Sequence, residues 1–258
     1  MDWQDDGFVL AARRHGESDA ILTLLTREHG RHLGIVKGGS GKRQRAVVEI
    51  GNRVTADWHA RLSEHLGRFA VELAAPHAAL CLDDPARLAA LSSACATLDA
   101  ALPEREPHPD IFDEFALLAA ALSERAPDWP AAFVRWEARL LSALGFGLDL
   151  TQCALTGETE GLAFVSPKTG RAVTAEAAGL HRERLLALPA FLWRRQDDVG
   201  RDDVVAGLRL TGHFLERNVF AHAVKHGAAE ARARLVERLA ARKYGESEGS
   251  GSWASRLW

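Results

Sequence analysis

The sequence predicts an α+β protein, in which a small β-barrel precedes an all-α helical domain. Up to about residue 75, the apolar residues come in short runs that turn residues separate. Short strands at nearly even spacing, with glycines between them, are typical of a small antiparallel barrel or sandwich. A segment of about 75 residues with this many strands suits the five-stranded OB-fold. Beyond Pro76, the apolar residues recur at the helical period instead.

The predicted strands are short apolar runs, and the third of them ends at a glycine-rich turn. That turn reads Gly38-Gly39-Ser40-Gly41, and Gly51-Asn52 interrupts the apolar pattern further along. The runs lie at residues 8–11, 20–25, 33–36, 47–50, 54–58 and 69–73. We therefore expect the first 76 residues to form one barrel domain.

The helical half opens at Asp84-Pro85, where an N-cap residue precedes a proline at the first helical position. A polar linker at residues 103–109 leads to a second helix, which Asp110 can cap. A third helix begins near Trp129 and ends at Gly145, because glycine commonly follows the last helical residue. Two later helices are expected at residues 202–224 and from 228 to about 243.

Residues 150–178 break the helical pattern with glycines and with short apolar runs at 162–165 and 172–173. We expect one or two small hairpins here, inserted into the helical domain. The predicted organisation is a barrel domain at 1–76, a helical domain at 77–244 with an inserted element at 149–179, and a tail at 245–258. The tail is rich in Gly and Ser, which is the composition of a flexible linker.

Composition narrows the class of protein. The formal net charge is −3, so any binding of nucleic acid must come from a local patch. The three cysteines are scattered and form no CxxC pair, which is unlike a disulfide framework and fits a reducing compartment. No apolar run reaches the roughly 18 residues that span a bilayer, and residues 1–6 are acidic and polar, unlike a secretory signal. We expect a cytoplasmic protein that does not enter the membrane.

The sequence contains no recognisable group of reactive side chains. The segment Gly38–Arg43 is the best candidate for a phosphate loop. The motif requires glycine at position 36 and serine or threonine at position 43, but these positions hold Val36 and Arg43, so the motif is not present. The cysteines lack a protease signature. His213 and Glu216 have the spacing of one helical metal pair, without a second pair to complete it. We therefore predict no catalytic residue, no metal site and no cofactor, and hence a protein that is not an enzyme.

Positive charge concentrates between Arg27 and Arg53, against Glu28 and Glu49 alone. A basic loop at the rim of a barrel can follow a phosphate backbone without reading sequence. A charge run by itself is more often a solvated face, but the rim of an OB-fold commonly binds single strands. The predicted DNA-binding residues are Arg13, Arg14, Arg31, Lys37, Lys42, Arg43 and Arg45.

Aromatic residues within the predicted barrel strands are few, namely Phe8, Trp58 and Phe69. All three lie in an apolar strand pattern, which favours core packing over stacking on nucleobases. We therefore expect contacts to the phosphate backbone to outweigh base stacking.

Several motifs, taken in their order and spacing, resemble the RecO family of recombination mediators. In the first half they are Asp6-Gly7-Phe8-Val9-Leu10, His15-Gly16-Glu17-Ser18-Asp19, Leu24-Leu25-Thr26-Arg27-Glu28-His29-Gly30-Arg31, Val36-Lys37-Gly38-Gly39 and Trp58-His59-Ala60-Arg61-Leu62. In the second half they are Phe146-Gly147-Leu148-Asp149-Leu150, Phe164-Val165-Ser166-Pro167 and Leu210-Thr211-Gly212-His213-Phe214-Leu215-Glu216. The resemblance runs from about Trp3 to about Leu239.

This resemblance implies a DNA repair and recombination mediator that is associated with the nucleoid. Proteins of that family bind single- and double-stranded DNA, anneal complementary strands and pair with RecR. They also bind the acidic C-terminal tail of single-strand-binding protein and help to load RecA on coated DNA. By the same analogy, the barrel rim carries DNA and a groove of the helical domain takes the partner's tail. Candidates for that groove are Arg182-Glu183-Arg184 and the set Arg232, Arg234 and Arg238.

The inserted element departs from the family pattern. Many RecO proteins carry two CxxC pairs there, and four thiolates suit the tetrahedral preference of zinc. The matching positions in this chain are Cys153, Thr156, Thr174 and Ala177. One thiolate cannot hold structural zinc, so the expected element is a degenerate zinc-ribbon-like hairpin without metal.

Two other functions remain open from the residues alone. A non-enzymatic OB-fold protein that binds RNA would have the same barrel, because Arg and Lys contacts to a backbone do not separate DNA from RNA. An enzyme could also assemble its site from dispersed residues such as His29, His32 and Asp57. Turnover of a phosphodiester or nucleotide that is lost on mutating the two histidines would support the last possibility.

Overall fold

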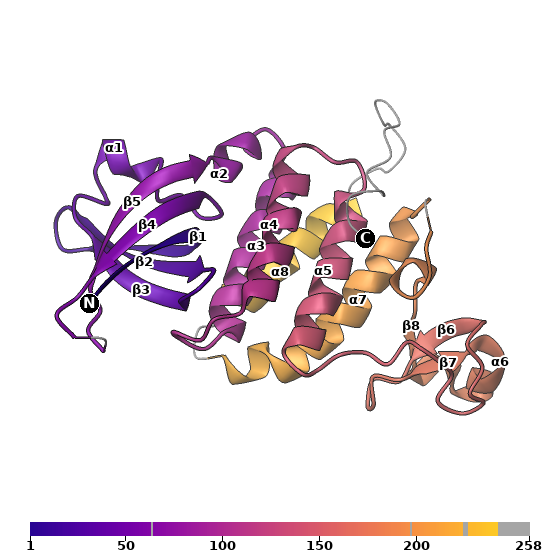
Figure 1. Cartoon of the computed structure of the whole chain (residues 1–258). Coiled ribbons are helices and arrows are strands. Elements are labelled where there is room, and N and C mark those ends of the chain that lie inside the picture. Colours follow the sequence, from indigo (N-terminus) through magenta and orange to yellow (C-terminus); the bar gives the residue numbers. More distant parts are fainter. Residues whose placement is uncertain (63, 197, 224–226, 242–258) are drawn as a thin grey trace. The chain divides into compact units, whose positions relative to one another are not determined.

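The computed structural model describes residues 1–62, 64–196, 198–223 and 227–241. The chain divides into two compact units, between which helix α8 (Gly227–Ala241) is shared. The first unit holds residues 1–125 and α8 up to Leu235, and the second holds residues 126–223 and the rest of α8. Figure 1 follows the chain through both units by colour. The predicted tail at 245–258 lies outside the described residues.

Five strands of the first unit close into a barrel, which confirms the predicted α+β class and its N-terminal barrel (Figure 1). The strands are β1 (Asp2–His15), β2 (Asp19–Thr26), β3 (Gly30–Val36), β4 (Arg53–His59) and β5 (Arg68–Ala75). Their order around the barrel is β1-β2-β3-β5-β4, with β1 also paired to β4. β3 and β5 are parallel, while the other pairs are antiparallel. This Greek-key order is that of the OB-fold.

Strand β1 is much longer than the apolar run that predicted it. It has 14 residues, and its register to β2 shifts between Val9 and Ala11. Such a bulge bends a strand and increases its twist, so the first part of β1 pairs with β4 and the second part with β2. The predicted run at 47–50 is not a strand. Helix α1 (Lys42–Arg45) precedes it, and the carbonyl of Gln44 accepts the N–H groups of Val47 and Val48 in turns.

The barrel interior is filled by side chains that alternate along the strands. The fully buried members include Val9, Leu22, Leu24, Val54 and Ala56. Trp58 and Phe69 also belong to this core, as the sequence predicts. Because each buried aliphatic side chain contributes about 1.5–3 kcal/mol, this interior stabilises the barrel strongly.

Helices cover one outer wall of the barrel. They are α2 (His77–Leu80), α3 (Pro85–Ala101) and α4 (Pro109–Ser123). Phe8 points out of the barrel, and its ring lies 5.2 Å from that of Phe112 and 4.8 Å from that of Phe115. The change from strand to helix falls at the predicted boundary near Pro76, but packing of α3 and α4 on β1 extends the compact unit to Arg125.

Of the two predicted helix-capping residues, the structure confirms one and contradicts the other. The carboxylate of Asp84 accepts the N–H groups of Ala86 (2.9 Å) and Arg87 (3.3 Å), so its capping role is confirmed. Asp110 was expected to cap the second helix, and that prediction is wrong, because α4 begins one residue earlier at Pro109. Asp110 lies in the first turn instead, where its charge still favours the helix dipole.

The second unit pairs two helices with a small sheet. Helix α5 (Trp129–Ala143) packs on α7 (Arg201–Asn218), and the hydroxyl of Thr211 donates to the buried carboxylate of Glu137 at 2.5 Å. The inserted sheet has the order β7-β6-β8, so the predicted hairpin gains a third strand. Its elements are β6 (Leu162–Val165), β7 (Ala172–Thr174), α6 (Ala175–Ala178) and β8 (Leu186–Ala187), with short 3-10 turns η1 (Gly179–Arg184), η2 (Ala190–Leu192) and η3 (Phe220–His222).

His213 on α7 lies 3.1 Å from the carbonyl oxygen of Pro167, so its ring fixes the hairpin on the helix. In the part of the chain that the structure describes, no helix is both long and apolar enough to cross a bilayer.

Candidate nucleic-acid interface

One end of the barrel is formed by the β1–β2 turn and the loop after β3. The carboxylate of Asp19 accepts the N–H of Gly38 at 2.9 Å. Ser40 donates its N–H to the carbonyl of Ser18 and its hydroxyl to the carbonyl of Asp19, both at 2.8 Å. Hydrogen bonds therefore tie the glycine-rich loop to the neighbouring turn.

The close approach of the two segments requires glycine at position 39. A Cβ added to Gly39 would lie 2.8 Å from the Cβ of Ala20 and 3.1 Å from the carbonyl oxygen of Val36. Real Cβ atoms do not come so near to a neighbouring Cβ, so a side chain there would push the loop away from β2.

Basic side chains gather around this pair of loops. Arg14 lies opposite Ala20, and Ala20 lies opposite Val36, so one strand separates Arg14 from Lys37. Neighbouring strands lie about 4.8 Å apart. We call this surface the basic rim, and its described side chains, all exposed, are Arg13, Arg14, Lys37, Lys42 and Arg45. Arg43 belongs to α1 within the same loop, but its side chain is outside the described set.

The basic rim also contains acidic and carbonyl groups that order it. The guanidinium of Arg14 donates to the carbonyl of Glu17 at 3.0 Å, and Arg45 lies 3.9 Å from the carboxylate of Glu49. The N–H of Gly38 is the main cause of a lowered pKa at Asp19, and the Ser18 hydroxyl and the charges of Lys37 and His15 add to it. Asp19 is therefore ionised at neutral pH, and the rim keeps a net excess of positive charge.

Arg31 is placed differently from the other predicted DNA-binding residues. Its guanidinium donates to the carbonyl of Leu102 at 2.7 Å and to the carboxylate of Asp99 at 3.2 Å. The side chain is only 12% exposed, and Glu104 lies 3.6 Å away. Arg31 therefore anchors the segment after α3 to the barrel, and we leave it out of the interface.

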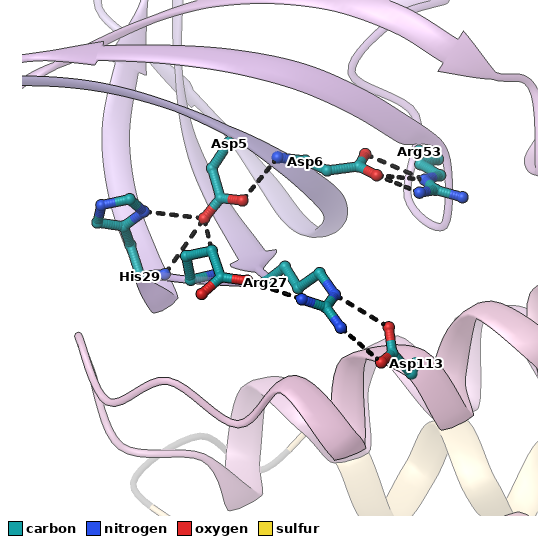
Figure 2. A network of polar contacts seen from close by, with 7 residues as sticks. Asp5, Asp6, Arg27, His29, Arg53 and Asp113 are labelled. Atoms are coloured by element: carbon teal, nitrogen blue, oxygen red, sulfur yellow. Dashed lines mark hydrogen bonds and ion pairs between the residues drawn. The ribbon is translucent and has the colours of Figure 1, made fainter.

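Two other arginines of the basic stretch are also held in ion pairs (Figure 2). Arg27 donates from Nε and Nη2 to both carboxylate oxygens of Asp113 on α4, at 3.1 and 2.9 Å. This pairing holds the pKa of Asp113 below its usual range. Arg53 pairs with Asp6 across β4 and β1. The charge that the sequence concentrates between Arg27 and Arg53 is thus divided between structural ion pairs and the basic rim.

The opposite end of the barrel carries an aromatic cluster that the sequence did not predict. The indole of Trp3 is stacked on the imidazole of His29, with ring centroids 4.2 Å apart and planes 7° apart. Trp58 is also stacked on Trp3, with ring centroids 5.5 Å apart and planes 17° apart. Trp3 was missed because it stands in the acidic segment before the first apolar run.

Two histidines, His29 in the β2–β3 turn and His32 on β3, also lie at this end of the barrel. His32 is 4% exposed and lies inside the barrel, where burial lowers its pKa. His29 stacks on Trp3, and its Nδ1 lies 2.8 Å from the carboxylate of Asp5. Asp57 is exposed on the outer face of β4, because the next residue, Trp58, points inward. These three side chains therefore do not assemble an enzymatic site.

In the inserted element, the residues at the family's zinc positions do not suit zinc. The Sγ of Cys153 lies 3.8 Å from the hydroxyl of Thr174 and accepts the Thr174 N–H at 3.4 Å. Zinc prefers four thiolate or imidazole ligands, whereas these positions offer one thiol, two hydroxyls and Ala177. Within the described residues, no group of three or more His, Cys, Asp or Glu side chains could hold a metal ion.

Instead of binding a metal, the sulfur of Cys153 accepts hydrogen bonds from its neighbours. Burial alone would raise the pKa of the Cys153 thiol, but the Thr156 hydroxyl and the N–H groups of Thr174, Leu155 and Thr156 outweigh it and lower the pKa to about 6. The Thr174 hydroxyl accepts the N–H of Ala177 at 3.3 Å. The Cys153 sulfur and the Thr174 hydroxyl together order the segments that begin at these two residues.

These features define an OB-fold protein with a basic rim and an appended helical region. Comparison with known proteins then makes the assignment specific. A family model described as the N-terminal part of recombination protein O matches residues 1–77, and one for its C-terminal part matches residues 82–227. The chain belongs to the RecO family and is a DNA repair protein.

Individual relatives match nearly the whole chain. The DNA repair protein RecO of Rhodospirillum centenum is 55% identical over 241 residues, which cover 92% of this chain and 94% of the relative. That of Rhodospirillum rubrum is 51% identical over 244 residues, covering 93% and 96%. That of Phenylobacterium zucineum is 50% identical over 240 residues, covering 93% and 98%.

Proposed function

We propose that this protein is a non-enzymatic recombination mediator, which binds single-stranded DNA on the basic rim and anneals complementary strands. Together with RecR, it helps to load RecA onto DNA coated by single-strand-binding protein in the RecFOR pathway. The observation that carries the proposal is the hydrogen-bonded pairing of the β1–β2 turn with the glycine-rich loop. This pairing brings cations from two separate parts of the sequence to one rim.

Phosphate contacts explain how the rim can bind without reading sequence. Arg13, Arg14, Lys37, Lys42 and Arg45 are exposed, so they are accessible to a passing backbone. Neutralising about four to six phosphates gives a log–log salt slope on the order of −3 to −4. Double-stranded DNA carries the same phosphates, so we expect it to bind on the same rim.

Annealing needs no catalytic group. Complementary strands pair spontaneously, and a protein that lowers their mutual repulsion accelerates their encounter. Among the residues that the structure describes, His29 and His32 pack on the ring of Trp3, whereas Asp57 lies on the outer face of β4. The three candidates therefore do not converge on one site, which supports a binding function over chemistry.

For the acidic tail of single-strand-binding protein we favour η1 of the second unit. Leu180 is 97% exposed there, and the exposed Arg182 and Arg184 follow it. An exposed apolar side chain next to two cations suits a peptide that is both acidic and apolar. Of the other set, Arg232 is 6% exposed and therefore a poor candidate, whereas Arg234 and Arg238 remain on the surface of α8.

The test is annealing of complementary strands coated with the cognate single-strand-binding protein, without nucleotide. We would compare the intact chain with a variant in which Lys37, Lys42, Arg43 and Arg45 are replaced by Ala. A matched control replaces the exposed Lys168, Arg194, Arg201 and Arg209 by Ala, which removes the same charge from the second unit. We expect rapid, salt-sensitive annealing by the intact chain and the control, and loss in the rim variant.

Two outcomes would overturn the proposal. If the intact chain does not anneal coated strands with or without RecR, it is not a mediator. If matched RNA oligonucleotides compete better than DNA, the protein is an RNA-binding OB-fold protein instead. The names of its relatives, which are DNA repair proteins, favour DNA.

A further inference from the structure

The barrel end opposite the basic rim holds three nearly parallel rings. β2 runs from Asp19 at the rim to Thr26, so the β2–β3 turn that contains His29 lies at the other end. They are the rings of Trp58, Trp3 and His29, and Trp3 is stacked on each of the other two. We call these three side chains the His29 stack.

The inner part of the stack is rigid. Trp58 is 3% exposed, and its indole N–H donates to the carbonyl of Leu66 at 3.3 Å. Trp3 is partly buried, and the rings of His32 and Phe69 meet it edge-on at 5.2 and 5.9 Å. Trp3 therefore cannot turn away without disturbing the barrel core.

His29 forms the outer ring of the stack. Its side chain is 35% exposed. Because Trp3 covers one face of the imidazole, that exposure belongs to the opposite face and the ring edge. Figure 2 shows His29 at one end of the drawn contacts, joined to Asp5, with Asp113 and Arg53 on the opposite side of the view.

Asp5 fixes the orientation of the imidazole. One oxygen of its carboxylate lies 2.8 Å from the Nδ1 of His29 and accepts the N–H of His29 at 3.2 Å and that of Glu28 at 2.9 Å. The Asp5 side chain is only 5% exposed. A ring that is already oriented loses little entropy when a ligand stacks on it.

We propose that the open face of His29 stacks on an unpaired nucleobase of the single-stranded DNA that the basic rim holds by its phosphates. This inference rests on the proposed DNA binding and adds a base-stacking subsite to it. Every nucleobase has a π-face, so stacking of this kind tolerates any sequence.

Length and charge both favour a nucleobase at this place. The eight residues of β2 separate the two ends of the barrel by roughly 26 Å, a span within the reach of the roughly 4–16 nucleotides that one OB-fold holds. Charges beside the stack have both signs, with Glu28 and Glu104 close to Arg27 and Arg31. A neutral ring is therefore a better ligand here than a phosphate, which the basic rim binds instead.

The experiment compares the affinities of an oligothymidine and an abasic oligomer of equal length and charge. The intact chain should prefer the oligothymidine by roughly 5- to 100-fold, the range that one stacked base produces. His29→Ala should abolish this preference while leaving the salt dependence unchanged. His29→Phe keeps an aromatic face and should restore most of the preference. The rim variant, which keeps Arg13 and Arg14, should show a weaker salt dependence but keep the preference.

The outcomes separate the two proposals. Salt-dependent binding with the same preference in the intact chain and His29→Ala would overturn the stacking subsite and leave the proposed function standing. Failure of the intact chain to bind either oligomer would overturn both. Should His29→Ala unfold, crosslinking of the intact chain to 5-iodouracil DNA decides. Attachment at His29 or Trp3 supports the subsite, and attachment only elsewhere overturns it.

Discussion

The carboxylate of Asp19 accepts the N–H of Gly38 at 2.9 Å, and this bond joins the turn before β2 to the loop after β3. The same carboxylate is a negative charge within the basic rim, close to Lys37 and His15. Asp19 therefore has two opposing effects on DNA binding. It orders the loop that presents cations, and it repels the phosphates that those cations attract.

Substitutions at Asp19 should separate these effects. Asp19→Asn removes the charge but keeps an oxygen that can accept the Gly38 N–H, so affinity for single-stranded DNA should equal or exceed that of the intact chain. Asp19→Ala removes both, and the untied loop should lower affinity by roughly threefold to tenfold relative to Asp19→Asn. Fluorescence anisotropy at fixed salt measures the affinity of each variant for single-stranded DNA. Equal affinities for the two variants would show that the hydrogen bond does not matter for binding.

Gly30 is the place where the barrel and the segment after α3 come closest. Its φ is +68°, and a Cβ added there would lie 2.1 Å from the carbonyl oxygen of Glu106. Gly30→Ala should therefore lower the free energy of unfolding by roughly 2–4 kcal/mol, from backbone strain and displacement of the linker. Gly16→Ala is the matched control, since Gly16 has a φ of +60° with nothing within 4 Å of the added Cβ. It should cost only about 1–2 kcal/mol. Urea unfolding measures the free energy of unfolding of both variants. An equal loss in the two would show that the contact of Gly30 with Glu106 does not matter for stability.

The barrel was predictable because its core strands have a simple apolar pattern, but the first half of β1 was not. Asp2, Asp5 and Asp6 surround Trp3 in the sequence and look like a solvated terminus. In the fold, Asp5 binds His29 and Asp6 binds Arg53, so these acids have long-range partners that no local pattern reveals. The aromatic cluster was missed for the same reason.

The basic stretch shows a similar limit. A count of charges cannot tell a free arginine from a paired one when the partner is far along the chain. Arg27 pairs with a residue 86 positions away, and Arg31 with one 68 positions away. Loops 13–19 and 37–45 were predictable as a basic surface because the contacts of their described arginines, Arg14 with Glu17 and Arg45 with Glu49, are local in the sequence.

Two buried histidines should make stability depend on pH. Burial lowers the pKa of His32 and of His77 from the ordinary value of 6.5, and the charge of Arg53 adds to the effect at His77. The unfolded chain then binds more protons than the folded chain below about pH 6.5, so stability is full above this pH and is lost as the pH falls. Each histidine contributes a slope of at most about 1.4 kcal/mol per pH unit.

Urea unfolding between about pH 7.5 and pH 5.5 measures this slope. His32→Gln and His77→Gln should each reduce it, whatever they do to stability at the higher pH. His15→Gln serves as the control, because His15 is exposed in the β1–β2 turn and should leave the slope unchanged. A slope that neither buried-site variant alters would mean that other groups cause the pH dependence.

The inserted element should fold without zinc. Thr174 is 4% exposed, and its hydroxyl accepts the N–H of Ala177 and contacts the Sγ of Cys153. Thr174→Val keeps the shape but leaves the Ala177 N–H without its acceptor, which should destabilise the second unit by about 1–3 kcal/mol.

A strong chelator, by contrast, should leave the melting temperature unchanged, since one thiol and two hydroxyls are a poor ligand set for zinc. Metal analysis of the purified chain measures the number of zinc ions bound per chain. About one zinc per chain, lost on chelation together with a fall in melting temperature, would show that ligands outside this cluster complete a metal site.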